Sequence, residues 1–266
     1  MAAKLAGVLG KDPQPYLREA GLAARAMRRE LWLEDRGCFA EFKDLLGSQP
    51  VHADPALWTF YHTIDCEVPD AREAWRMSLD IDRRLPRIPL TGPGVPAGCF
   101  TVPTSNWMPY AWSVNNVVLG EAMHGALAYW QCRRPETAFP LFKGSLLNSM
   151  FTGLCPGNVG MCSSFDAYRG ESQRDFADGA GSMSRALVEG LFGIRPDSLS
   201  GEILLRPGFP AVWDKASIHH PDLDFSFRRE GASDIYQVNC RFTKPVFIRL
   251  EIPARLDRIE AVKVNG

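Results

Sequence analysis

Five charged side chains fall within ten residues of the chain, and their types are those used in hydrolytic chemistry. Asp175 and Asp178 lie three residues apart, directly before an apolar helical pattern over residues 180–192. Catalytic groups are often mounted on a loop that a rigid element holds in place. The same charges could instead pair with one another as a structural ion network, and this segment alone favours neither interpretation. The five are Arg169, Glu171, Arg174, Asp175 and Asp178.

Glu41 is a second carboxylate of interest, because the aromatic residues Phe39 and Phe42 stand beside it. A carboxyl group in an apolar setting has a raised pKa and can serve as a general acid. The alternative is a short amphipathic helix over residues 37–47, with Glu41 and Asp44 in water.

Aromatic and amide side chains gather between residues 104 and 116. Aromatic faces stack on the CH-rich faces of sugar rings, and Asn amides both donate to and accept from hydroxyl groups. An aromatic plug in the core explains the cluster equally well. The candidate sugar-binding residues here are Trp107, Tyr110, Trp112, Asn115 and Asn116.

Composition excludes several classes of function. The formal net charge is −1, so the chain carries no basic footprint for nucleic acid. The sequence contains no run of about 18 apolar residues, so no membrane-spanning helix is predicted. The seven cysteines are scattered without a CxxC pair, which favours free thiols over a zinc site or a disulfide framework. We therefore expect no metal and no cofactor.

Apolar spacing of about 3.6 residues predicts the elements that would position these groups. Asp70 and Glu73 form a capping-box pattern, and Gly193 with Pro196 predicts where the last helix ends. His52 and His62 bracket one helix and could contact a substrate, although structural roles are commoner for such residues. The predicted helices cover residues 14–34, 55–65, 70–85, 114–133, 135–149 and 180–192.

Towards the C-terminus the apolar period changes from helical spacing to two, which is typical of strands. The sequence therefore predicts a fold that is mainly α followed by β. A helical domain would span residues 1–197, and an antiparallel β unit would span residues 198–266. Strands are expected near residues 223–227, 236–242, 246–252 and 259–264.

Several blocks resemble the bacterial family labelled domain of unknown function 4450, whose members look like six-hairpin glycosidases. The blocks are GxFAEFKDxxG, HxDPALWTFYHTID, TSNWMPYAWSVNNVVxxE, YRGExxRDFAD, SRALVEGLFGI and LRPGFPxxWDxASI. The segment from EGLFGIRPD to WDKASI is also similar to the barrel-to-sheet junction of glycoside hydrolase families 94 and 95. The resemblance implies a partial α/α toroid of about three helical hairpins, followed by β structure.

The resemblance to family 95 implies an inverting glycosidase in which Asp178 is the general base. Ala180 stands where that family has an Asn, which places the substrate-side contacts in doubt. The candidate general acids are Glu41 and then Glu171. Arg169, Arg174 and Asp175 would orient the base and bind hydroxyl groups, beside a stacking platform of Trp107, Tyr110 and Trp112.

Two other functions stay open from the sequence. One is a non-catalytic carbohydrate-binding or scaffold module that keeps the aromatic platform without an acid–base pair. The other is a glycoside phosphorylase, for which Arg169 and Arg174 are the clustered anion-binding candidates. A half toroid also predicts a missing N-terminal half or a partner chain. The resemblance suggests a periplasmic or extracellular location.

Overall fold

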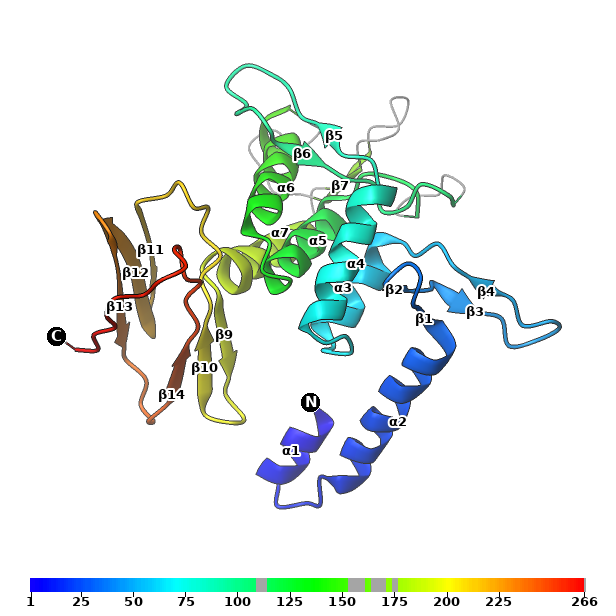
Figure 1. Cartoon of the computed structure of the whole chain (residues 1–266), viewed down its shortest axis with the longest axis horizontal. Helices are drawn as coiled ribbons and strands as arrows, with labels where there is room; N and C mark the ends of the chain where they lie inside the picture. Colours follow the sequence, from blue (N-terminus) through cyan, green and yellow to red (C-terminus); the bar gives the residue numbers. More distant parts are fainter. Residues whose placement is uncertain (109–113, 153–160, 164–170, 174–176, 266) are drawn as a thin grey trace.

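The computed structural model describes residues 1–108, 114–152, 161–163, 171–173 and 177–265, with side chains from 151 to 176 excepted. Helices dominate the first two thirds, and strands follow (Figure 1). The helices are α1 (Ala2–Val8), α2 (Gln14–Leu31), α3 (Leu57–Asp65), α4 (Ala71–Arg84), α5 (Leu119–Gln131), α6 (Pro135–Leu147) and α7 (Asp178–Arg185). Two π-helical turns, η1 (Asn148–Thr152) and η2 (Ala186–Leu191), extend α6 and α7.

Short two-stranded ribbons lie between the helices, and two three-stranded sheets form most of the C-terminal part. The ribbons are β1 (Trp32–Leu33) with β2 (Cys38–Phe39), β3 (Phe42–Lys43) with β4 (Val51–His52), β5 (Ile88–Pro89) with β6 (Phe100–Thr101), and β7 (Met161–Ser163) with β8 (Glu171–Gln173). One sheet has the order β14 (Phe247–Leu250), β10 (Glu202–Leu205), β9 (Ile194–Asp197). The other has the order β11 (Lys215–His220), β12 (Leu223–Glu230), β13 (Ser233–Cys240).

Local signals account for several element boundaries. The Asp70 side chain accepts from the backbone N–H of Glu73, and the Glu73 side chain accepts from that of Asp70. This confirms the capping box at the start of α4. Gly193 adopts a φ of +68° just after η2, as expected of a glycine that ends a helix. A Cβ there would also meet the carbonyl oxygen of Arg206 at 1.9 Å, so only glycine fits where the helical part meets β10.

Four predicted elements differ from the structure. Residues 37–47 form parts of two ribbons instead of a short helix. The helix expected from residue 114 begins at Leu119, because Asn116 binds the backbone of Thr104 and Val117 instead. No strand covers residues 259–264. The C-terminal sheets are antiparallel except that β14 pairs in parallel with β10.

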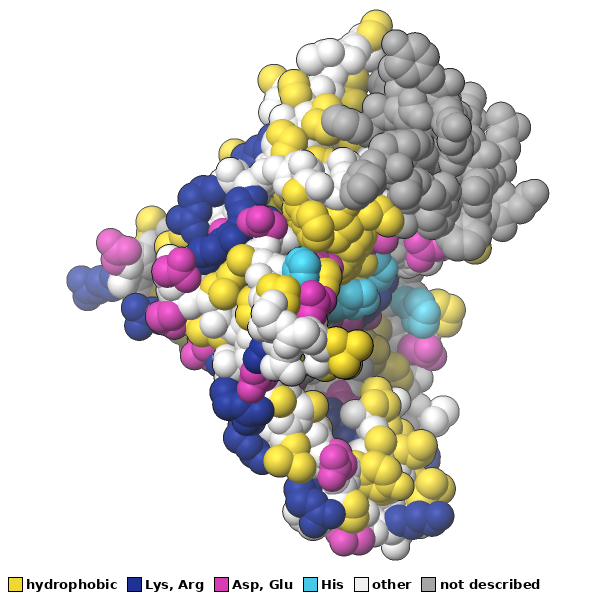
Figure 2. Space-filling model, turned by 90° about the vertical axis from the view of Figure 1, so that its right-hand side faces the viewer, with side chains coloured by type: hydrophobic (Ala, Val, Ile, Leu, Met, Phe, Trp, Pro, Cys, Tyr) yellow, Lys and Arg dark blue, Asp and Glu magenta, His cyan; other side chains and the backbone are white. Residues whose placement is uncertain are grey.

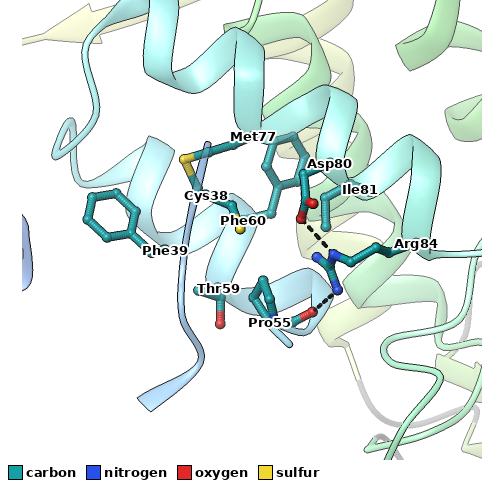
Figure 3. A pocket seen from close by; sticks show the side chains of 9 residues that line it. All are labelled: Cys38, Phe39, Pro55, Thr59, Phe60, Met77, Asp80, Ile81 and Arg84. Atoms are coloured by element: carbon teal, nitrogen blue, oxygen red, sulfur yellow. Dashed lines mark hydrogen bonds and ion pairs between the residues drawn. The ribbon is translucent and has the colours of Figure 1, made fainter. Parts of the chain in front are cut away.

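Arg84 forms an ion pair within α4 and a hydrogen bond to the segment before α3, beside a small pocket (Figure 3). Arg84 Nε donates to Asp80 Oδ2 at 2.6 Å, and Arg84 Nη1 donates to the carbonyl oxygen of Pro55 at 2.8 Å. Burial, together with the neighbouring Asp80 carboxylate, raises the pKa of the Cys38 thiol to about 12. Cys38 therefore stays protonated, and this small pocket serves packing rather than nucleophilic chemistry.

Candidate functional site

Helix α5 is the central helix of the described part, since it packs against α3, α6 and α7. Every residue from 116 to 130 is buried except two. The exceptions are Glu121 and His124, which lie three residues apart and so share one face of the helix. A buried helix whose partly exposed side chains are a carboxylic acid and an imidazole directs attention to that face.

Helices α3 and α7 present polar side chains towards the same face. On α7 and η2, residues 178, 185 and 189 recur at helical spacing, as residues 61 and 65 do on α3. Together these side chains form what we call the polar stripe. Its members are Tyr61, His62 and Asp65 of α3, Glu121, His124 and Gln131 of α5, and Asp178, Arg185 and Glu189 of α7 and η2.

Two carboxylates lie at one end of the polar stripe. Glu121 is in the first turn of α5, and Asp178 is in the first turn of α7, where the helix dipole favours negative charge. The Tyr61 hydroxyl donates to Glu121 Oε2. Burial and the charge of Asp178 raise the pKa of Glu121, while the hydrogen bond from Tyr61 opposes that rise. Asp178 is exposed, so the two carboxylates lie in contrasting environments.

Two histidines flank Tyr61 in the middle of the stripe. The rings of Tyr61 and His124 stack with centroids 5.0 Å apart and an interplanar angle of 24°, and the ring of His62 lies 4.4 Å from that of Tyr61. Burial lowers the pKa of His124, which keeps its imidazole neutral at neutral pH. Figure 2 shows histidine side chains gathered beside acidic ones on one face of the molecule.

An ion network closes the other end of the polar stripe. Arg185 donates from Nη1 and Nη2 to both oxygens of Asp65, at 3.0 and 2.6 Å. It also donates from Nε to Glu189 at 3.1 Å, and Gln131 donates to Asp65 at 3.1 Å. Burial works to raise the pKa of Asp65, but the hydrogen bonds from Arg185 and Gln131 lower it overall. This network ties α3, α5 and η2 together.

The stripe also gives the direction of its three helices. Tyr61 meets Glu121 and Asp65 meets Gln131, so α3 and α5 run the same way. Arg185 lies seven residues after Asp178 on α7 and binds Asp65, so α7 runs in the same direction. The first turns of α5 and α7 therefore converge on one end, where the carboxylates lie.

The predicted acid Glu41 is engaged in packing. Its carboxylate accepts from the backbone N–H of Ala56 at 2.8 Å, from the Trp58 indole and from the Thr59 hydroxyl. These three donors fix the start of α3 and occupy both oxygens. These contacts give Glu41 a structural role, and its part as a general acid stays a prediction.

The predicted sugar-binding residues have different outcomes. Trp107 is exposed, and Asn115 donates to the carbonyl oxygen of Met108 at 2.6 Å. Asn116 is fully buried, so its side chain is inaccessible to a substrate, which corrects that prediction. Tyr110, Trp112, Arg169, Arg174 and Asp175 lie outside the described residues, and Glu171 is described by its backbone in β8 alone.

The residues that sequence reasoning missed are Glu121, His124 and Tyr61. A signal for the first two was present, since they are the acid and the imidazole within the apolar run VVLGEAMHGALAYW. Their spacing of three residues indicates a shared helix face. Tyr61 carried no signal of its own, because its partner Glu121 lies 60 residues further along the chain.

Comparisons with known proteins give no family for the chain. No protein-family model matches it, and no curated protein shows significant similarity to it. Among the described residues, no group of His, Cys, Asp and Glu side chains is arranged to hold a metal ion. A search of the same residues finds no helix that is both long and apolar enough to span a membrane.

Proposed function

We propose that this chain is a glycoside hydrolase-like protein that hydrolyses an oligo- or polysaccharide with inversion at the anomeric carbon. Asp178 is the general base, and Glu121 is the general acid. The observation that carries the proposal is the contrast between these carboxylates on the first turns of neighbouring helices: Asp178 is exposed, whereas Glu121 is largely shielded and burial raises its pKa. Titratable groups with diverging environments are the usual mark of an acid–base pair.

The proposed reaction uses each group once. Glu121 gives its proton to the glycosidic oxygen as the bond from that oxygen to the anomeric carbon breaks. Asp178 takes a proton from a water molecule as the water oxygen bonds to the opposite face of that carbon. Inversion requires about 6.5–9.5 Å between the carboxyl groups to hold this water. Exchange of one proton through solvent then restores both groups.

The rest of the polar stripe supports the roles of the pair. His62 and the neutral His124 offer ring nitrogens that can bind sugar hydroxyls. The network of Arg185 with Asp65 ties the end of α7 to α3. An acid–base pair needs such rigid support, because a displacement of about 1 Å can cost a hundredfold in rate.

We also propose the partial α/α toroid and the resemblance to six-hairpin glycosidases as the architecture behind this site. Helices α3, α5 and α7 run the same way around the polar stripe. Short links then lead from α3 into α4 and from α5 into α6. Alternation of parallel inner helices with returning helices is the arrangement that a helical-hairpin toroid requires.

The test is turnover of a panel of aryl glycosides and oligosaccharides by the purified chain. We expect Asp178→Asn and Glu121→Gln each to lower kcat by about 10²–10⁴-fold, the usual contribution of a general acid or base. Glu19→Gln is the matched control, because Glu19 is an exposed carboxylate on α2. Product released first as the inverted anomer, followed by NMR, would support the mechanism.

Three outcomes would count against the proposal. Sugar binding by the wild type without turnover would favour a non-catalytic module. Turnover that requires inorganic phosphate would favour a phosphorylase. Turnover that survives both substitutions would remove Asp178 and Glu121 from the reaction.

A further inference from the structure

We propose that Tyr61 is the positioning residue of the site, which holds Glu121 by one oxygen and leaves Oε1 to carry the proton that is transferred. This inference rests on the proposed function, since it assigns Tyr61 a part in the same acid catalysis. The hydrogen bond from the Tyr61 hydroxyl to Glu121 Oε2 is the contact that carries it.

Tyr61 is fixed in two directions at once. Its side chain is buried, at 7% exposure, and its ring stacks on His124, one turn along α5 from Glu121. The hydroxyl thus reaches Glu121 from a ring that cannot swing away. Because a hydroxyl donor binds a lone pair, the acidic proton of Glu121 is directed to the other oxygen.

The same contact sets the strength of the acid. Burial raises the pKa of Glu121, and so does the negative charge of Asp178. The hydrogen bond from Tyr61 favours the ionised carboxylate and lowers the pKa. A general acid works best when its pKa lies near the working pH. The hydrogen bond from Tyr61 therefore offsets part of the rise in the pKa of Glu121 that burial causes.

A second buried tyrosine, on α5 with Glu121, provides a matched control. The Tyr129 hydroxyl donates to Asp82 Oδ1 at 2.8 Å, and the Tyr129 side chain is 2% exposed. This pair joins α5 to α4 and lies outside the polar stripe. Loss of either hydroxyl removes one buried tyrosine–carboxylate hydrogen bond, so a structural effect alone should be similar at the two sites.

The experiment compares Tyr61→Phe with Tyr129→Phe, because phenylalanine keeps each ring and removes only the hydroxyl. The first readout is the pKa of Glu121, followed by NMR of its ¹³C-labelled side-chain carboxyl and assigned by loss of the signal in Glu121→Gln. The second is the pH profile of kcat/KM on the best substrate. Thermal unfolding of both variants measures the structural effect of each substitution.

We expect Tyr61→Phe to raise the pKa of Glu121 and to move the alkaline limb of the pH profile to higher pH. Its kcat should also fall, because Oε1 is no longer held in place. Tyr129→Phe should leave the pKa of Glu121 and the pH profile unchanged, although it should lower the thermal stability about as much as Tyr61→Phe does. An unchanged pKa of Glu121 in Tyr61→Phe would overturn the inference even in an active enzyme. If the wild type shows no turnover, the proposed function fails, and the NMR titration still tests the contact.

Discussion

At the scale of the residue, the Asp65–Arg185 pair shows how charge is used to hold the site. Both side chains are about one third exposed, at 31% and 34%, so solvent screens the pair in part. Two parallel hydrogen bonds nevertheless fix its geometry, and Glu189 and Gln131 add further contacts. Such a bidentate pair contributes orientation as well as stability.

Asp65→Asn should destabilise the fold by roughly 1–2 kcal/mol at neutral pH, because it removes a carboxylate that accepts charge-assisted hydrogen bonds. The pKa of Asp65 is lowered in the folded protein, so its contribution is present above the ordinary value of 3.8. That contribution is lost as the pH falls through the lowered folded value. The difference in unfolding free energy between wild type and variant should therefore be constant from pH 7 to 5 and shrink towards pH 2.

Urea unfolding at several pH values measures this difference directly. Asp257→Asn is the control, since Asp257 is exposed near the C-terminus and its substitution should change the unfolding free energy little. A difference for Asp65→Asn that stays constant down to pH 2 would show that the carboxylate charge is not what stabilises the pair.

At the scale of the element, η2 lies against α5 through a glycine. A Cβ added at Gly190 would meet Cε3 of Trp130 at 2.3 Å, which is too close for any real side chain. The indole of Trp130 also donates to the carbonyl oxygen of Gly208 at 2.9 Å, so it cannot move aside freely. Close packing of η2 on α5 sets how Arg185 approaches Asp65.

Gly190→Ala should therefore destabilise the protein by about 1–3 kcal/mol through overpacking. Gly181→Ala on α7 is the matched control, because an added Cβ there meets nothing within 4 Å. Alanine is the better helix former, so the control should stabilise by about 0.5–1 kcal/mol. Urea unfolding midpoints of the two variants should move in opposite directions, and an equal shift for both would contradict the packing argument.

The elements also show how far sequence reasoning reaches. Helix α4 could be predicted to within a residue at each end, because its capping box is a local signal. Residues 37–47 could not, since β2 and β3 are two-residue strands that are too short to show a sequence period and depend on pairing with β1 and β4. The start of α5 was missed because Asn116 is recruited by Thr104, twelve residues earlier.

Of the candidate site, one carboxylate could be predicted from the sequence and the other could not. Asp178 could be proposed from sequence, because a carboxylate directly before an apolar helix is visible in the chain. Glu121 was passed over for Glu41, since aromatic neighbours in sequence suggested an apolar setting for Glu41. In the structure it is Glu121 whose pKa burial raises, and Glu41 is bound by three donors. Which face of a helix meets which neighbour is a tertiary property, and one sequence does not reveal it.

At the scale of the whole molecule, one continuous hydrophobic cluster extends from the helices into the C-terminal sheets. It includes Leu57, Met123 and Trp130 of the helical part together with Leu205 and Phe225 of the strands. Polar contacts cross the same boundary, since Glu136 of α6 accepts from the backbone N–H of Ala211 at 2.9 Å. A shared core predicts that both parts unfold in a single cooperative step.

Phe225→Ala tests this prediction from the sheet side. Phe225 is 1% exposed on β12, so its truncation should cost about 3–5 kcal/mol. In a cooperative molecule, amide hydrogen exchange should accelerate in α5 as much as in β12, although α5 itself is unchanged. Phe247→Ala is the control, because Phe247 is 65% exposed on β14 and should shift exchange little in either part. Faster exchange confined to the strands would mean that the helical part, with its polar stripe, is stable on its own.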